Sequence, residues 1–109
     1  LHGETGNDRI CGGAGNDSLY GGADSDLLEG GAGADLLRGS NVEGGGGGGR
    51  DTVSYAGSNN AVLVSVNGSG TGGDAAGDTL QNIEDLFGSA FNDTLYGDGS
   101  GNILQGDAG

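Results

Sequence analysis

The chain has 109 residues, of which 29 are glycine and none is proline, and 16 acidic side chains against 3 arginines give a formal net charge of −13. No stretch approaches the roughly 18 apolar residues of a membrane span, and so acidic a chain offers no basic patch for nucleic-acid phosphates. Collagen is excluded because glycine does not recur at every third position. With few large apolar side chains and many mutually repelling carboxylates, the chain is either disordered or completed by something positively charged that binds it.

A nine-residue repeat organises the beginning of the chain. Residues 3–11, 12–20, 21–29 and 30–38 read GETGNDRIC, GGAGNDSLY, GGADSDLLE and GGAGADLLR. Position six is always aspartate and position eight is always aliphatic: Asp8, Asp17, Asp26 and Asp35, then Ile10, Leu19, Leu28 and Leu37. Aspartate is also a common turn residue, but its identical phase in consecutive units favours metal binding.

After residue 38 the register slips. Residues 39–45 read as a repeat that has lost two residues, and residues 46–54 fit the pattern again with Asp51 at position six. Residues 61–66 are a β-rich run between turn-forming residues, so we predict that residues 55–72 hold a longer strand, inserted as a flap. Residues 73–81 return to the pattern with Asp78, and residues 82–87 resemble a strand rung without its loop. Residues 88–96 carry Asp93, and residues 97–105 carry Asn102.

The predicted organisation is a first repeat block at 3–54, the flap at 55–72, and a second block at 73–109 that is truncated at its C-terminus. Each unit combines a glycine-rich turn with three residues that make a minimal strand. Two units would complete one turn of a flattened coil, with parallel strands about 4.8 Å apart in successive turns and position-eight side chains inside. No helical periodicity survives the glycines, so we predict an all-β fold.

Stacked turns place the aspartate of each unit beside the aspartate two units later, in a column that faces main-chain carbonyls. Ca²⁺ accepts about six to eight oxygen ligands in flexible geometry, whereas Mg²⁺ needs a tighter octahedron and keeps its waters. Zinc and copper favour His and Cys, and the chain has one of each. The pattern therefore favours Ca²⁺, with several ions bound.

The tandem units GGAGNDSLY and GGAGADLLR resemble the GGxGxDxUx nonapeptide of the RTX (repeats-in-toxin) family. The resemblance covers residues 3–54 and 73–109. It implies a right-handed parallel β-roll, a solenoid of the β-helix type, with calcium between the loops of stacked turns. It also implies a bacterial protein exported by a type I system, because secreted toxins, metalloproteases, lipases, polysaccharide epimerases and adhesins carry such repeats.

The resemblance also implies sets of calcium ligands, position by position. One site would use the carboxylates of Asp8 and Asp26 with carbonyls at Gly3, Thr5, Gly22 and Asp24. The next would use Asp17 and Asp35 with carbonyls at Gly12, Ala14, Gly31 and Gly33. If residues 39–45 fill a half-turn, a third would pair Asp35 with Asp51 and use carbonyls at Gly30, Ala32, Gly47 and Gly49. In the second block, Asp78 would pair with Asp93 across residues 82–87. The chain departs from the pattern at Asp24 and Phe91, which replace glycine, and at Asn102, which replaces aspartate.

These features favour a non-catalytic calcium-binding module of a secreted or cell-surface bacterial protein, which folds when calcium rises outside the cell. No carboxylate is placed beside a base, a nucleophile or an apolar pocket that would tune it for catalysis. The alternative is an accessory module of a secreted enzyme, which binds a polysaccharide or stabilises an adjacent catalytic domain, or a spacer in an adhesin. Tyr20 and Tyr96, at position nine, would either stack on sugars or pack across strands.

Overall fold

The computed structural model describes residues 2–4, 6–22, 24–39, 50–66, 68–97 and 103–105. Its strands are β1 (His2–Glu4), β2 (Arg9–Cys11), β3 (Ser18–Gly22), β4 (Leu27–Glu29), β5 (Leu36–Arg38), β6 (Thr52–Ser54), β7 (Leu63–Ser65), β8 (Gly70–Thr71), β9 (Thr79–Gln81), β10 (Asp85–Phe87), β11 (Thr94–Tyr96) and β12 (Ile103–Gln105). A 3₁₀ helix spans Gly73–Ala75. In the described part of the chain, no helix is long and apolar enough to cross a membrane.

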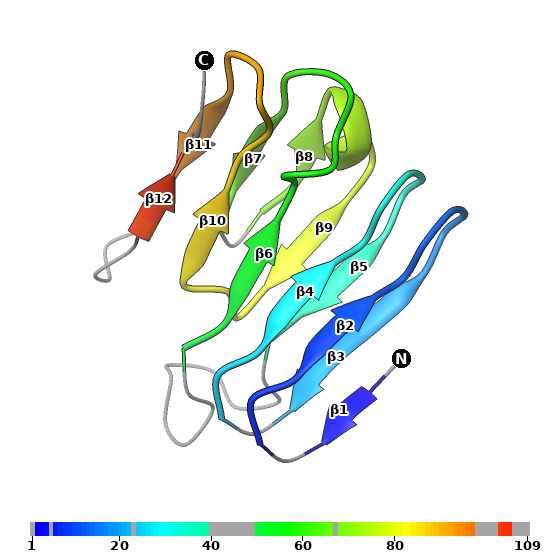
Figure 1. The fold of residues 1–109 in the computed structure, drawn as a ribbon, viewed down its shortest axis with the longest axis vertical. Helices are drawn as coiled ribbons and strands as arrows, with labels where there is room; N and C mark the ends of the chain where they lie inside the picture. Colours follow the sequence, from blue (N-terminus) through cyan, green and yellow to red (C-terminus); the bar gives the residue numbers. More distant parts are fainter. Residues whose placement is uncertain are drawn as a thin grey trace.

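From β1 to β6, successive strands alternate between two parallel sheets, and β7, β8 and β11 form a third, smaller sheet (Figure 1). One parallel sheet has the strand order β1-β3-β5-β9, and the other has the strand order β2-β4-β6-β10-β12. In the first turns a residue pairs with the residue 18 positions later, as Ile10 does with Leu28 and Leu19 with Leu37. Eighteen residues are two nine-residue units, so each turn of the coil contains one strand on each face. The chain is an all-β parallel β-roll, which confirms the predicted fold class.

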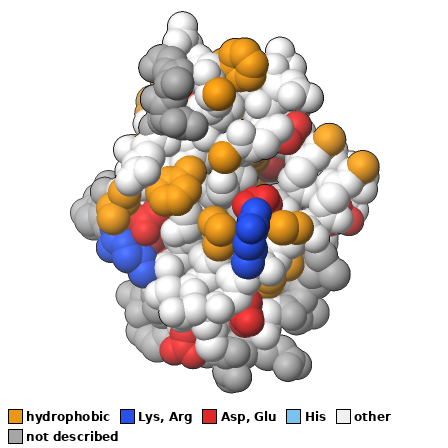
Figure 2. All heavy atoms as spheres, in the orientation of Figure 1, with side chains coloured by type: hydrophobic (Ala, Val, Ile, Leu, Met, Phe, Trp, Pro, Cys, Tyr) orange, Lys and Arg blue, Asp and Glu red, His pale blue; other side chains and the backbone are white. Residues whose placement is uncertain are grey.

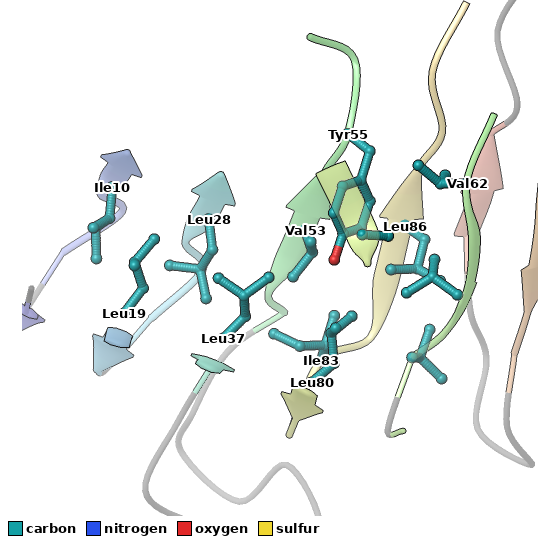
Figure 3. Close-up of a cluster of buried hydrophobic side chains, with 13 residues drawn as sticks. Ile10, Leu19, Leu28, Leu37, Val53, Tyr55, Val62, Leu80, Ile83 and Leu86 are labelled. Atoms are coloured by element: carbon teal, nitrogen blue, oxygen red, sulfur yellow. The ribbon is translucent and has the colours of Figure 1, made fainter. Parts of the chain in front are cut away.

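The position-eight residues of the units before residue 81 form the core between the two sheets, whereas Leu95 is partly buried and Leu104 is 38% exposed. Leu19, Leu28 and Leu37 are fully buried, whereas the residues on either side of Leu28 and Leu37 are only partly buried. This follows from the strand geometry, in which neighbouring side chains point to opposite faces. Figure 3 shows the core side chains following one another along the roll. The later turns add a larger set of buried side chains: Val53, Tyr55, Val62, Val64, Val66, Ala75, Leu80, Ile83 and Leu86.

The slip after residue 38 is a longer connection between two consecutive strands. β6 follows β5 along the chain and pairs with β4, so that Val53 lies beside Leu28. These two residues are 25 positions apart, seven more than the usual 18. The extra length therefore belongs to one connection, and the prediction that residues 39–45 fill a half-turn of their own is wrong. Residues 40–49 lie outside the described residues.

The inserted segment contributes a hairpin that pairs with the roll on both sides. β7 and β8 are antiparallel to each other, and β7 pairs with β11 in parallel. On the other side, Ser69 forms an antiparallel bridge with Thr79 of β9. The side chains of Val62, Val64 and Val66 are buried in the common core. The hairpin thus lies between β9 and β11 (Figure 1).

Candidate metal centre

The position-six aspartates form two hydrogen-bonded columns, one at each loop edge of the roll. In the first column, the Asp8 N–H donates to Asp26 Oδ1 at 2.8 Å, and the Asp26 N–H donates to Asp51 Oδ1 at 3.0 Å. In the second column, the Asp17 N–H donates to Asp35 Oδ1 at 2.8 Å, and the Asp35 N–H donates to Asp78 Oδ1 at 2.7 Å. One carboxylate oxygen of each acceptor therefore fixes the loop of the preceding turn.

A glutamate continues the first column beyond its aspartates. The Asp51 N–H donates to Glu84 Oε1 at 2.7 Å. Sequence analysis did not identify Glu84 because residues 82–87 lack the glycine-rich half of the repeat. A signal was nevertheless present, since Glu84 stands two residues before the buried Leu86, as each aspartate stands two residues before its own position-eight side chain.

At the end of the second column, a tyrosine hydroxyl donates a hydrogen bond to the second carboxylate oxygen of the aspartate. The Tyr55 hydroxyl donates to Asp78 Oδ2 at 2.8 Å, while Asp78 Oδ1 accepts the Asp35 N–H. Burial raises the pKa of Tyr55, so the hydroxyl remains a donor. Both oxygens of Asp78 thus have protein partners, which distinguishes Asp78 from the aspartates of the earlier turns.

The second oxygens of the earlier aspartates are buried without a partner. Among the described residues, this holds for the Oδ2 atoms of Asp8, Asp17, Asp26, Asp35 and Asp93. Asp26 and Asp35 are only 3% and 2% exposed. A buried carboxylate oxygen without a hydrogen bond is strongly unfavourable and indicates a ligand such as water or an ion. Four of these five atoms lie in the two columns, where stacked loops bring the carboxylates together.

The first glycine of each unit leaves room for this oxygen. A Cβ at Gly3 would lie 2.7 Å from Asp8 Oδ2, and a Cβ at Gly12 would lie 2.9 Å from Asp17 Oδ2. Glycines at 21 and 30 stand in the same relation to Asp26 and Asp35. Each unpartnered oxygen therefore lies over the glycine that opens its own repeat, which explains the need for glycine there.

The charge balance of the columns also favours a cation. Burial raises the pKa of Asp26 and Asp35, raises that of Asp51 to about 7, and raises that of Asp78 to about 6. Two of the arginines are paired with other acids: Arg9 lies 3.0 Å from Glu29, and Arg50 lies 2.7 Å from Asp85. On the face of the molecule drawn in Figure 2, arginine side chains (blue) lie beside acidic side chains (red). A bound divalent cation would neutralise the column carboxylates without protonating them.

The donor set is of the oxygen type that calcium prefers. In the described part of the chain, no three His, Cys, Asp or Glu side chains cluster as a metal site. A cation would therefore be held by pairs of carboxylates completed by main-chain carbonyls, a mixed set that suits Ca²⁺. Positive φ angles at Gly13, Gly15, Gly31 and Gly33 give these loops their sharp turns. The residues fit a calcium ion at Asp8 with Asp26 and at Asp17 with Asp35.

The structure departs from the predicted pairs after residue 38. Asp51 lies beside Asp26 instead of Asp35, and Asp35 lies beside Asp78. Because the extra residues lengthen one connection instead of adding a half-turn, Asp51 falls in the other column. Asp78 and Asp93 are not paired: Asp93 Oδ1 accepts the Val62 N–H at 2.9 Å and the Ser89 hydroxyl at 2.6 Å.

The remaining predicted ligands are main-chain positions. Three of them lie against the Oδ2 atoms of the aspartates: Gly3, Gly12 and Gly30. Four others have a positive φ: Gly22, Asp24, Gly31 and Gly33. Ala14 lies exposed in its loop. The Ala32 carbonyl accepts the Gly15 N–H at 3.0 Å. Thr5, Gly47 and Gly49 lie outside the described residues.

Without a bound cation, we expect the stability of the fold to decrease as the pH rises from about 4 to about 7. The pKa values of about 7 for Asp51 and about 6 for Asp78 exceed the ordinary value of 3.8. The folded state therefore binds more protons than the unfolded state in this range, and raising the pH favours unfolding. Far-UV circular dichroism in chelator should show more β structure near pH 5 than near pH 8. A β signal that instead grows with pH contradicts this assignment.

Parallel turns, paired buried carboxylates and glycine-lined loops define a calcium-binding β-roll. The family model for the RTX calcium-binding nonapeptide repeat, with four copies, matches residues 1–40 and 78–109. The chain belongs to this family. The unmatched residues between the two segments contain the lengthened connection and the β7–β8 hairpin. No curated protein matches the chain significantly.

Proposed function

We propose that this calcium-binding β-roll is a non-catalytic module of a secreted or cell-surface bacterial protein, and that it folds when it meets calcium outside the cell. The observation that carries the proposal is the row of buried, unpartnered Oδ2 atoms at Asp8, Asp17, Asp26 and Asp35. These atoms make the empty roll unfavourable and the loaded roll favourable. Membership of the RTX family supports the extracellular setting, because its proteins are typically secreted.

The ligands we propose are the two aspartate pairs of the first turns. Asp8 with Asp26 would hold one ion and Asp17 with Asp35 another, each completed by loop carbonyls. Bound calcium would supply the positive charge that the columns lack. A ligand that binds only the folded state stabilises it by mass action, so folding and calcium binding are linked.

One observation favours this function over a polysaccharide-binding role for Tyr20. The guanidinium of Arg38 lies over the Tyr20 ring, 6.0 Å from its centroid, across the β3–β5 pair. This is a cation–π contact between neighbouring strands. Arg38 thus covers a face of the Tyr20 ring, which supports cross-strand packing for this tyrosine.

We expect the chain to be largely unfolded in chelator and to gain β structure cooperatively at millimolar calcium. Far-UV circular dichroism during a calcium titration measures this directly. Magnesium should fold the chain only at much higher concentration, because it retains its waters and suits irregular carbonyl loops poorly. A full β signal in chelator, or equal midpoints for the two ions, would contradict the proposal.

A further inference from the structure

A second set of hydrogen bonds joins the stacked loops, one residue before each column aspartate. Asn7, Asn16 and Ser25 occupy position five, which the nonapeptide pattern leaves open. The Ser25 N–H donates to Asn7 Oδ1 at 3.0 Å, and the Ala34 N–H donates to Asn16 Oδ1 at 2.9 Å. The Arg50 N–H donates to Ser25 Oγ at 2.9 Å. In each case a side chain accepts from the equivalent position of the next turn.

These bonds have the opposite direction to those of the aspartates. Asp26 accepts from the main chain of the preceding turn, whereas Asn7 accepts from the main chain of the following turn. The dipeptides Asn7–Asp8 and Ser25–Asp26 therefore exchange two hydrogen bonds between the same two loops. Such a reciprocal pair fixes both the spacing and the rotation of one loop against the other, directly beside the carboxylates.

The asparagine acceptors at position five join loops whose aspartates each have an unpartnered oxygen. Asn7 joins the loops of Asp8 and Asp26, and Asn16 joins those of Asp17 and Asp35; all four of these aspartates have a buried Oδ2 without a partner. At the next step of the second column, where Tyr55 occupies the Asp78 oxygen, position five is Ala34. The two asparagine acceptors thus accompany the two candidate sites, whereas Ser25 joins the loop of Asp26 to that of Asp51.

We propose that Asn7 and Asn16 are positioning residues for the calcium loops, which set the separation of the paired carboxylates without contacting the ion. This inference rests on the proposed function. An amide or hydroxyl oxygen suits the task because it holds the main-chain N–H without adding a negative charge beside the carboxylates. By fixing the loop separation, these residues set the affinity of the site and its preference for an ion of calcium's size.

The test compares Asn16→Ala with Asn16→Ser and Asn92→Ala in titrations with calcium and with the larger ion strontium. Serine is the conservative replacement because Ser25 already accepts a main-chain N–H at this position. Asn92 is the matched control: it also precedes a position-six aspartate and is exposed like Asn16, but it has no hydrogen bond to a described residue. Circular dichroism gives the folding midpoint for each ion.

We expect Asn16→Ala to raise the calcium midpoint about three- to tenfold, as one lost hydrogen bond implies, and to bring the calcium and strontium midpoints closer together. Asn16→Ser should restore both values, and Asn92→Ala should leave them unchanged. A core variant, Val53→Ala, should shift both midpoints by the same factor. If Asn16→Ala does not fold, Asn7→Ala provides the same comparison at the first column.

An unchanged ratio of the calcium and strontium midpoints in Asn16→Ala and Asn7→Ala would overturn the inference. Loss of a merely structural residue would shift the folding midpoints for both ions by the same factor. An equal effect of Asn92→Ala would also overturn it. The proposed function fails separately, if the unmodified chain shows no calcium-dependent folding. The two failures are therefore distinguishable in one set of titrations.

Discussion

Asp26→Asn is expected to raise the calcium concentration required for folding by at least about tenfold, since loss of even an outer contact to a metal site has an effect of this size. Asp26 is central in the first column: its Oδ1 accepts the Asp8 N–H, and its own N–H donates to Asp51. Asparagine retains Oδ1, so the hydrogen-bonded column persists. The change falls on Oδ2, the buried atom without a partner.

The same substitution should not destabilise the chain in chelator. Burial raises the pKa of Asp26, so the metal-free fold disfavours its charged form relative to the unfolded chain, and the neutral amide does not carry this penalty. The variant therefore separates two roles of the aspartate: it preserves the role in loop stacking and removes the role in cation binding. Calcium titration measures the second role, and the β signal by circular dichroism in chelator near pH 5 measures the first. A smaller β signal than that of the unmodified chain in chelator would show that the aspartate is mainly structural.

Asp24→Asn is the matched control for this experiment. It removes the same charge two residues away, from an exposed side chain whose Oδ2 accepts the Gly6 N–H at 3.0 Å. Asp24 has a φ of 73°, and asparagine tolerates this left-handed conformation well. Its calcium midpoint should hardly change, and Asp8→Asn, at the end of the column, should have an intermediate effect. Equal shifts in all three variants would indicate bulk electrostatics instead of a site.

The period of the sequence predicts the fold because each unit has one residue that must be buried. Leu19, Leu28 and Leu37 recur at intervals of nine, which places neighbouring units on opposite faces and equivalent faces 18 residues apart. The stacking of Asp8 on Asp26 and of Asp17 on Asp35 follows from the same spacing of 18 residues. In this region local pattern and tertiary packing agree.

The column positions after residue 38 could not be predicted in the same way. Residues 46–54 fit the repeat whether the preceding residues form a half-turn or lengthen a loop, because Asp51 and Val53 keep their mutual spacing in both cases. Only the pairing of β6 with β4 shows that the loop is lengthened, and this pairing places Asp51 in the first column, beside Asp26. The contact of Tyr55 with Asp78 likewise depends on the return path of the hairpin.

Gly33→Ala is expected to destabilise the roll more than Gly15→Ala, although the two glycines occupy the same position of neighbouring stacked loops. Both have positive φ, 114° at Gly33 and 100° at Gly15, so alanine at either site costs about 1–2 kcal/mol in backbone conformation. At Gly15 an added Cβ would meet nothing within 4 Å. At Gly33 it would collide with the Gly15 carbonyl oxygen, which belongs to the main chain.

The difference between the two variants therefore measures how closely the loops must stack. The collision at Gly33 forces apart the loops that precede Asp17 and Asp35, the pair proposed to hold one ion. Gly33→Ala should thus lower the unfolding free energy at saturating calcium and also raise the calcium midpoint, whereas Gly15→Ala should show mainly the smaller backbone cost. Urea unfolding at fixed calcium, together with calcium titration, gives both quantities. Equal effects of the two substitutions would mean that loop separation does not control the site, because the collision is the main difference between them.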